Sequence, residues 1–203
     1  IRVMASGTLA DASGRTLSGQ TVEAFCTSLS HAQLLSLGLN CAYGAKQLLP
    51  YLERLAETAP FRISAHPNAG LPNVMGGYDE TPEMFAEDVG EYMRRGLVNI
   101  VGGCCGTTPE YIAATVRKTS SIPFRAPIEK NKTVVSSYTH AVEVADSPIL
   151  IGERINPTGK PKLKEALRSG DFNYILNEGV RQSEAGAHIL DVNVGLPEID
   201  EAE

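Results

Sequence analysis

The stretch that decides the fold is Val98-Asn-Ile-Val-Gly-Gly-Cys-Cys-Gly-Thr-Thr-Pro109. Its apolar start, residues 98–101, predicts a short buried strand, which the two glycines that follow bring to an end. Thr108-Pro109 predicts the beginning of a helix, because threonine caps a first turn and proline suits the first helical position. We therefore expect the adjacent thiols, Cys104 and Cys105, at the carboxyl end of a strand, where α/β barrels carry their active sites.

These two cysteines can hardly form a disulfide with each other, because their Cα atoms are ~3.8 Å apart and the favoured disulfide separation is larger. Metal binding is therefore the function that we favour for Cys104 and Cys105. The alternative is that both are small, apolar core residues, as reduced cysteines often are. A redox dithiol is disfavoured, since the pair lacks the two-residue spacer of the usual redox motif.

Four consecutive strand–loop–helix units are predicted from residue 1 to residue 119. The predicted strands and the helices that follow them are 1–6 and 22–35, 37–41 and 45–59, 61–65 and 81–95, and 98–101 and 109–119. Pro50 is expected to delay or kink the second helix. Long loops after the strands and short returns from the helices are typical of an α/β fold of the (β/α)8 TIM-barrel type. Four units are half of such a barrel.

The pattern changes after residue 120. Residues 121–147 are rich in proline, lysine and serine and predict a linker, with one short strand near Val134. A second series of units is predicted at 148–203, with helices at 161–167 and 172–185 and a strand at 188–195. We therefore divide the chain into half a barrel (1–120), a linker (121–147) and the first βα units of a second barrel (148–203), and we expect it to be a piece of a longer protein.

A third candidate ligand, Cys41, ends the predicted strand at 37–41 and so lies on the same face as the cysteine pair. Three thiolates are soft ligands that favour tetrahedral zinc, and they leave a fourth position open. Cys26 lies inside a predicted helix and is expected in the core. His66 and Asn68 follow the strand at 61–65, where the Asn68 amide is available for a ligand or for holding its own loop.

Polar residues also gather where the two strands of the second series end. A carboxylate and a carboxamide follow or end each strand: Glu153 and Asn156 in the first, and Asp191 and Asn193 in the second. Such pairs match the donor and acceptor edge of a heterocycle. The alternative is that they are ordinary polar loop residues.

The composition excludes two classes of partner. The 203 residues carry a net charge of −6 and no basic run, whereas nucleic acids and anionic membranes bind basic surfaces. No apolar run approaches the ~20 residues of a membrane span. Four cysteines in an acidic chain of helices and strands favour the cytoplasm over a secreted disulfide scaffold.

The motifs together resemble the cobalamin-dependent methionine synthase family, the 5-methyltetrahydrofolate–homocysteine methyltransferases, over nearly the whole chain. The stretches that carry the resemblance are Gly38-Leu-Asn-Cys41, Ala65-His-Pro-Asn-Ala-Gly-Leu-Pro-Asn73, the Gly-Gly-Cys-Cys-Gly segment, Gly152-Glu-Arg-Ile-Asn-Pro-Thr-Gly159 and Asp191-Val-Asn193. The Gly-Gly-Cys-Cys-Gly segment with an upstream Asn-Cys is specific to a homocysteine-binding barrel. The Gly-Glu-Arg-Ile-Asn start of a pterin-binding barrel separates this family from homocysteine methyltransferases that lack a folate module.

The resemblance implies a role for each candidate residue. The homocysteine sulfur would take the open position of a zinc ion bound by three thiolates, with Asn68 holding the amino-acid end of that substrate. The implied zinc ligands are Cys41, Cys104 and Cys105, and the implied 5-methyltetrahydrofolate contacts are Glu153, Asn156, Asp191 and Asn193.

The resemblance also implies the reaction and its partners. In the family the methyl group passes from folate to cob(I)alamin, and then from methylcobalamin to the zinc-bound sulfur. The cobalamin-binding domain lies outside this chain. Residues 1–120 would be the C-terminal half of the homocysteine-binding barrel, and 148–203 the start of the pterin-binding barrel. Open barrel edges favour a dimer, and we do not expect such a fragment to turn over alone.

Two alternatives stay open. One is a zinc-dependent homocysteine S-methyltransferase that uses another methyl donor. The other is a non-catalytic fragment whose cysteines are reduced core residues.

Overall fold

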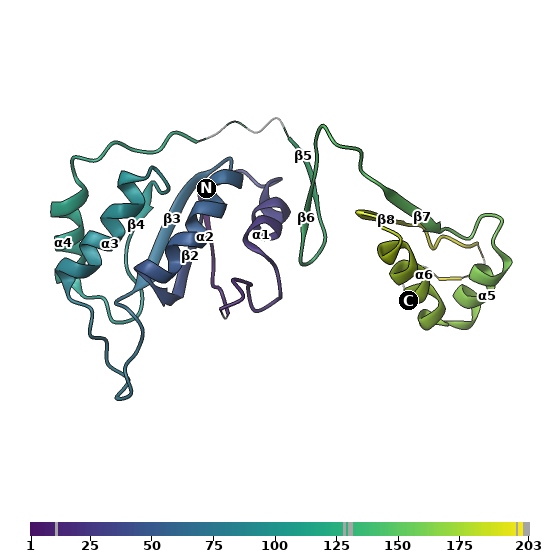
Figure 1. Cartoon of the computed structure of the whole chain (residues 1–203), viewed down its shortest axis with the longest axis horizontal. Coiled ribbons are helices and arrows are strands. Elements are labelled where there is room, and N and C mark those ends of the chain that lie inside the picture. The colour runs from purple at the N-terminus through teal and green to yellow at the C-terminus, as the bar shows by residue number, and fades with distance from the viewer. Residues whose placement is uncertain (11, 128, 130–131, 198, 201–203) are drawn as a thin grey trace. The chain divides into compact units, whose positions relative to one another are not determined.

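A parallel sheet lies at the centre of the first part of the chain (Figure 1). Within the residues that the structure describes (1–10, 12–127, 129, 132–197 and 199–200), this computed structural model has four strands here, in the order β1-β2-β3-β4, each parallel to its neighbour. The strands and helices alternate as β1 (Val3–Gly7), α1 (Val22–Leu29), β2 (Leu34–Gly44), α2 (Ala45–Thr58), β3 (Arg62–Asn68), α3 (Pro82–Arg94), β4 (Ile100–Val101) and α4 (Pro109–Thr119). The predicted α/β alternation is confirmed, and closure into a barrel stays a prediction.

Helices cover one face of this sheet. Leu37 and Leu39 of β2 point to the same side, since alternate residues of a strand do, and both are buried. The helix residues in the same core recur three or four positions apart, as an amphipathic helix requires: Leu48, Leu52 and Leu55 of α2, and Phe85, Val89 and Tyr92 of α3. Each fully buried side chain of this size contributes roughly 1.5–3 kcal/mol to stability.

Small residues occupy three central positions between the core residues of β2 and β3. Gly38 pairs with Ser64, and a Cβ atom at Gly38 would lie 2.1 Å from both the carbonyl and the hydroxyl oxygen of that serine. Ser36 and Ser64 are buried, and in the described part of the chain their hydroxyl groups have no hydrogen-bond partner. This close approach of the two strands requires glycine.

The first helix and the second strand differ from their predicted bounds. Helix α1 ends at Leu29 rather than at residue 35, and β2 begins at Leu34 rather than at residue 37. Ser30 ends the helix, and its hydroxyl donates to the carbonyl oxygen of Cys26 at 2.9 Å. Leu34 pairs with Val3 of β1, so residues that the apolar pattern assigns to the helix belong to strand β2 instead. Cys26 is fully buried, as predicted.

Three smaller predictions are correct only in part. Helix α2 starts at Ala45, as predicted, with Pro50 inside it, so this proline does not delay the helix. Strand β4 is shorter than predicted, since the Asn99 side chain replaces part of the ladder by accepting the Ile63 N–H at 3.0 Å. Thr108 is the N-cap of α4, but its hydroxyl donates to the carboxylate of a neighbouring glutamate instead of accepting a backbone N–H.

The predicted linker contains more structure than one strand near Val134. Strands β5 (Thr133–Ser136) and β6 (Ala141–Val144) form a two-stranded sheet. Strand β5 packs on α1, and the Thr21 N–H donates to the Thr139 carbonyl oxygen at 3.4 Å. Each of these strands is four residues long, too short for the alternation of the sequence to reveal both.

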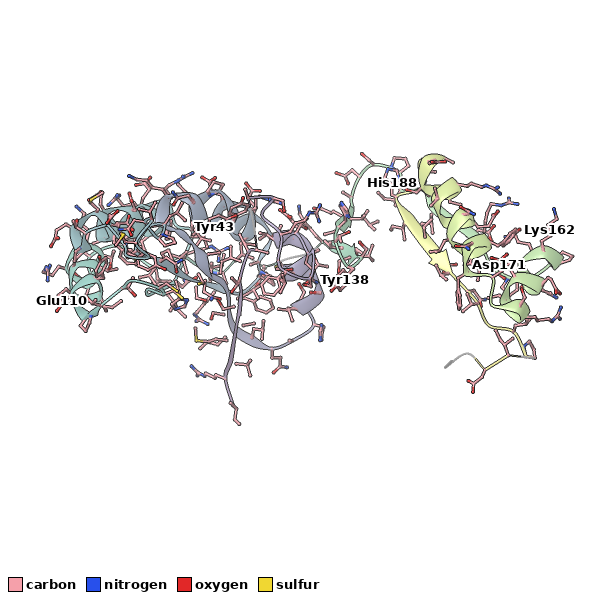
Figure 2. The ribbon with its side chains drawn as sticks, turned by 90° about the horizontal axis from the view of Figure 1, so that it is seen from below. Tyr43, Glu110, Tyr138, Lys162, Asp171 and His188 are labelled. Atoms are coloured by element: carbon pink, nitrogen blue, oxygen red, sulfur yellow. The ribbon has the colours of Figure 1, made fainter. Side chains whose placement is uncertain are left out.

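The chain divides into two compact units, Ile1–Ala141 and Val142–Glu203. The second unit consists of β7 (Ile151–Ile155), α5 (Pro161–Ser169), α6 (Phe172–Glu184) and β8 (Ile189–Val192). Strands β7 and β8 pair in parallel and α6 packs on both. Asp171, labelled in Figure 2, caps α6 by accepting the Tyr174 N–H at 3.1 Å. Within the described ranges, none of the helices has the length and apolar character that crossing a membrane requires.

Candidate metal centre

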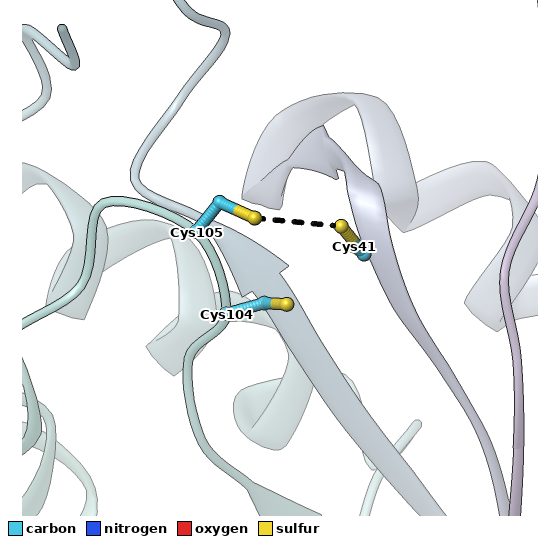
Figure 3. A group of neighbouring side chains, drawn as sticks. All are labelled: Cys41, Cys104 and Cys105. Carbon is cyan, nitrogen blue, oxygen red and sulfur yellow. Dashed lines mark hydrogen bonds between the residues drawn. The ribbon is translucent and has the colours of Figure 1, made fainter.

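Three cysteine side chains point toward one another, Cys41 from the last residues of β2 and Cys104 and Cys105 from the loop after β4 (Figure 3). The sulfur atoms of Cys41, Cys104 and Cys105 lie within 4.8 Å of one another, and the Cys41 and Cys105 sulfurs are 3.7 Å apart. Tetrahedral zinc with Zn–S bonds of about 2.3 Å requires sulfur–sulfur separations of about 3.8 Å. The thiol ligand set and its spacing therefore fit a zinc ion.

Strand β3 brings the cysteines together although it carries none of them. It lies between β2 and β4, whose ends should be about 10 Å apart at the usual strand spacing. Two backbone hydrogen bonds draw the loop after β4 over the end of β3. Cys104 donates its N–H to the Pro67 carbonyl oxygen at 2.8 Å, and Ala69 donates to the Cys105 carbonyl oxygen at 2.9 Å. The cysteine pair is thus held close to the end of β2.

Cys41 reaches the cluster through an irregular end of β2. The register of β2 against β3 shifts between Asn40 and Gly44, and within this interval Cys41 and Ala42 have φ angles of 59° and 62°. A left-handed conformation costs a residue other than glycine roughly 1–2 kcal/mol. Strain of this kind is typical of functional sites, where surrounding contacts maintain it.

Asn68 connects the two sides of the cluster. Its side chain is 4% exposed, and its Oδ1 accepts the Cys105 N–H at 3.1 Å. The same carboxamide, after the Ala42 backbone N–H, is among the groups that lower the pKa of the Cys41 thiol. Asn68 therefore holds its loop and the cysteines, while its predicted contact with homocysteine stays a prediction. His66 packs on Gly102, and burial lowers the pKa of its imidazole.

The pKa values of two thiols move in opposite directions. A hydrogen bond from the Ala42 backbone N–H is the main cause that lowers the pKa of Cys41. Burial, with the neighbouring Cys41 thiol adding to it, raises the pKa of Cys104 to about 11. Zinc binds thiolates, so metal binding must displace the Cys104 proton. Cys41 is the thiol whose surroundings favour the anionic form.

A comparison with known protein families identifies the domain that carries this cluster. The model of the homocysteine S-methyltransferase family matches residues 1–119 of the 203. The chain belongs to the homocysteine S-methyltransferase family. The matched segment contains all three clustered cysteines, and the family implies homocysteine as substrate. The predicted homocysteine methyltransferase domain is thus confirmed at the level of the family, and the match leaves the methyl donor unspecified.

Two residues that contact the cysteine loop were not predicted from the sequence. The Tyr78 ring lies against Gly106, and desolvation, followed by the nearby Cys105 thiol, raises the pKa of its hydroxyl. Thr107 donates its hydroxyl to the Cys104 carbonyl oxygen at 2.7 Å. The sequence does offer a weak indication of Tyr78, which is an aromatic residue in a glycine-rich loop after a strand.

The polar residues predicted to contact folate lie in the second unit. Asn156 and Asn193 follow the paired strands β7 and β8. Each carboxamide oxygen accepts the backbone N–H two residues further on, at 3.0 Å for Asn156 and 2.9 Å for Asn193. Glu153 and Asp191 are exposed on the two strands. Two of the four thus lie on adjacent strands and two directly after them, and their role toward folate stays a prediction.

Proposed function

We propose that this chain binds zinc through Cys41, Cys104 and Cys105 and presents the sulfur of homocysteine to a methyl donor. The observation that carries the proposal is the convergence of three thiols within 4.8 Å in a domain of the homocysteine S-methyltransferase family. Zinc would lower the pKa of the substrate thiol, so that this thiol reacts as a thiolate at neutral pH. Three protein ligands leave one tetrahedral position for the substrate sulfur.

The residues around the cluster have separate tasks in this proposal. Cys105 is exposed whereas Cys41 and Cys104 are half-buried, so substrate approaches from the side of Cys105 and releases its thiol proton there to solvent. Asn68 and Thr107 hold the two sides of the loop that carries the cysteine pair. Their hydrogen bonds keep the ligands in place before a metal or a substrate arrives.

We further propose that the methyl donor is 5-methyltetrahydrofolate and that cobalamin, bound by a domain outside this chain, carries the methyl group, as in cobalamin-dependent methionine synthases. The parallel β7–β8 pair supports this, because the polar residues that the resemblance assigns to folate lie on these two strands or directly after them: Glu153, Asn156, Asp191 and Asn193.

On this proposal, residues 1–120 end a homocysteine barrel, 121–147 form a linker and 148–203 begin a pterin barrel. The unpaired edges of β1 and β4 in the described sheet would admit a second copy, which is the basis for a dimer. The cysteines of the cluster form no disulfide, in keeping with the cytoplasm as the site of action.

Zinc analysis of the purified chain tests the metal site. We expect about one zinc per chain, strong loss of zinc in Cys104→Ser, and unchanged zinc in Cys26→Ala, which alters the core cysteine of α1. Addition of homocysteine should release protons only when zinc is present. Equal zinc content in wild type and Cys104→Ser would contradict the proposal and favour reduced core cysteines.

Equilibrium binding of 5-methyltetrahydrofolate tests the choice of donor. We expect binding to the wild-type chain and weaker binding to Asn193→Ala, with Lys162→Ala, on the exposed start of α5, as the control. Zinc-dependent homocysteine binding without any folate binding would instead favour a homocysteine methyltransferase with another donor.

A further inference from the structure

The loop between β3 and α3 has a defined structure of its own. Asn73 organises it, since its Oδ1 accepts the Gly77 N–H at 2.9 Å and its Nδ2 donates to the Asp79 carboxylate at 2.8 Å. Pro72 and Tyr78 form an antiparallel bridge across the base of the loop. These contacts hold the backbone of Tyr78 in one position.

This backbone position brings the Tyr78 side chain onto the cysteine loop. A Cβ atom at Gly106 would lie 2.4 Å from Cγ of the Tyr78 ring, and Gly106 has a φ angle of +80°. Both the space and the backbone conformation therefore require glycine at this position. The residue directly after Cys105 thus forms the surface on which the ring packs, and this packing holds the phenol next to the residue pair that carries the thiols.

A second tyrosine anchors the other end of the loop. The Tyr111 hydroxyl, from α4, donates to the carbonyl oxygen of Glu80, two residues beyond Tyr78. Its ring packs edge-to-face on Phe85 of α3, with the ring centroids 5.5 Å apart. Tyr78 is therefore fixed from both sides and is not a mobile loop residue that happens to touch a thiol.

Hydrogen-bond donors next to metal ligands orient those ligands and moderate their charge, and removing such a donor typically costs about 10–100-fold in metal affinity. A metal-bound thiolate keeps lone pairs that can accept such a bond. Among the three clustered cysteines, Cys105 is the exposed one. It is the ligand whose orientation most needs a contact from outside its own loop.

We propose that Tyr78 is a positioning residue of the metal centre, which donates a hydrogen bond to the Cys105 sulfur and so sets the orientation and charge of that ligand. This inference rests on the proposed zinc site. It makes the β3–α3 loop a third segment of the centre, beside the end of β2 and the loop after β4.

The test compares the full chain as wild type, Tyr78→Phe and Tyr138→Phe. Phenylalanine keeps the ring on Gly106 and removes only the hydroxyl. Tyr138, labelled in Figure 2, is 66% exposed in the β5–β6 turn and serves as the matched control. Zinc affinity is measured by competition with a chelator, and the thiolate-to-cobalt charge-transfer band is recorded after loading with Co²⁺.

We expect Tyr78→Phe to weaken zinc binding about 10-fold and to move the charge-transfer band to longer wavelength, because loss of the hydrogen bond raises the energy of the sulfur lone pairs. Tyr138→Phe should match wild type in both. Zinc affinity of Tyr78→Phe within twofold of wild type, or weaker binding with an unmoved band, would overturn the inference and leave the zinc site standing. A wild-type chain that binds neither metal would overturn the proposed function and this inference together.

Discussion

Glu80 should make the stability of the first unit depend on pH. Its carboxylate oxygen Oε2 is buried and, among the described residues, has no hydrogen-bond partner. Burial, and then the negative charge of Asp88 on α3, raises the pKa of Glu80 to about 7. Lys46 acts in the opposite direction and lies 3.7 Å from Asp88. The folded chain therefore holds a proton on Glu80 that the unfolded chain releases at lower pH.

The sign of the effect follows from the two pKa values. In the unfolded chain Glu80 ionises near 4.5 and in the folded chain near 7, so its stabilising contribution is fully present below pH 4.5 and is lost as the pH rises through 7. The difference between these two pKa values corresponds to a change of about 3.4 kcal/mol in the free energy of unfolding. Because the carboxyl group is only partly buried, solvent screening reduces the effect to roughly 1–2 kcal/mol.

Glu80→Gln removes the titration and keeps the shape of the side chain. We expect its free energy of unfolding, relative to wild type, to rise by roughly 1–2 kcal/mol between pH 4.5 and pH 8. Urea titrations followed by far-UV circular dichroism measure this, since the chain has no tryptophan for fluorescence. Glu83→Gln, whose side chain is 76% exposed on α3, is the control and should show no such rise. An equal difference between Glu80→Gln and wild type at both pH values would refute the reasoning.

Three further substitutions test the contacts described above. Gly38→Ala places a Cβ atom 2.1 Å from a carbonyl oxygen of β3, and we expect urea titration to show a loss of about 3 kcal/mol, whereas an unchanged midpoint would contradict the close strand approach. Asn68→Ala leaves the Cys105 N–H without its acceptor; we expect a loss of about 1–3 kcal/mol and weaker zinc binding by chelator competition, and wild-type values for both would count against it. Arg125→Ala removes a guanidinium group that donates to two backbone carbonyl oxygens at 2.9 and 3.2 Å, so its thermal midpoint should fall, while Arg117→Ala, 68% exposed, should melt like wild type.

The helix starts were predictable because their cause is local. The Thr81-Pro82 pair begins α3 within the predicted range, and Pro109 begins α4 at the predicted residue. The end of α1 was not predictable from the apolar pattern, because Leu34 fits the pattern of a helix and of a strand equally well. Only its pairing with β1 makes it part of a strand. The residues that cap a helix are adjacent to it in the sequence, whereas the bounds of a strand depend on its pairing with another strand that is distant in the sequence.

The candidate site divides in the same way. The meeting of Cys41 with the cysteine pair could be predicted, since the carboxyl ends of parallel strands lie at one edge of a sheet. The left-handed backbone of Cys41, the hydrogen bond from Cys105 to Asn68 and the packing of Tyr78 on Gly106 could not be predicted. Each depends on contacts between residues that are far apart in the sequence, so no local sequence pattern predicts them.

Strand β3 explains why the cysteine cluster can form in an open sheet. The end of β3 supplies the Pro67 carbonyl oxygen, the Asn68 carboxamide and, just beyond it, the Ala69 N–H, and these groups hold the loop that carries Cys104 and Cys105. All of these contacts lie within β2, β3, β4 and the segments that follow them, and none involves the outer edges of the sheet. Metal binding should therefore not depend on closure of a barrel. Methyl transfer makes a further demand, because the donor must also reach the exposed side of Cys105.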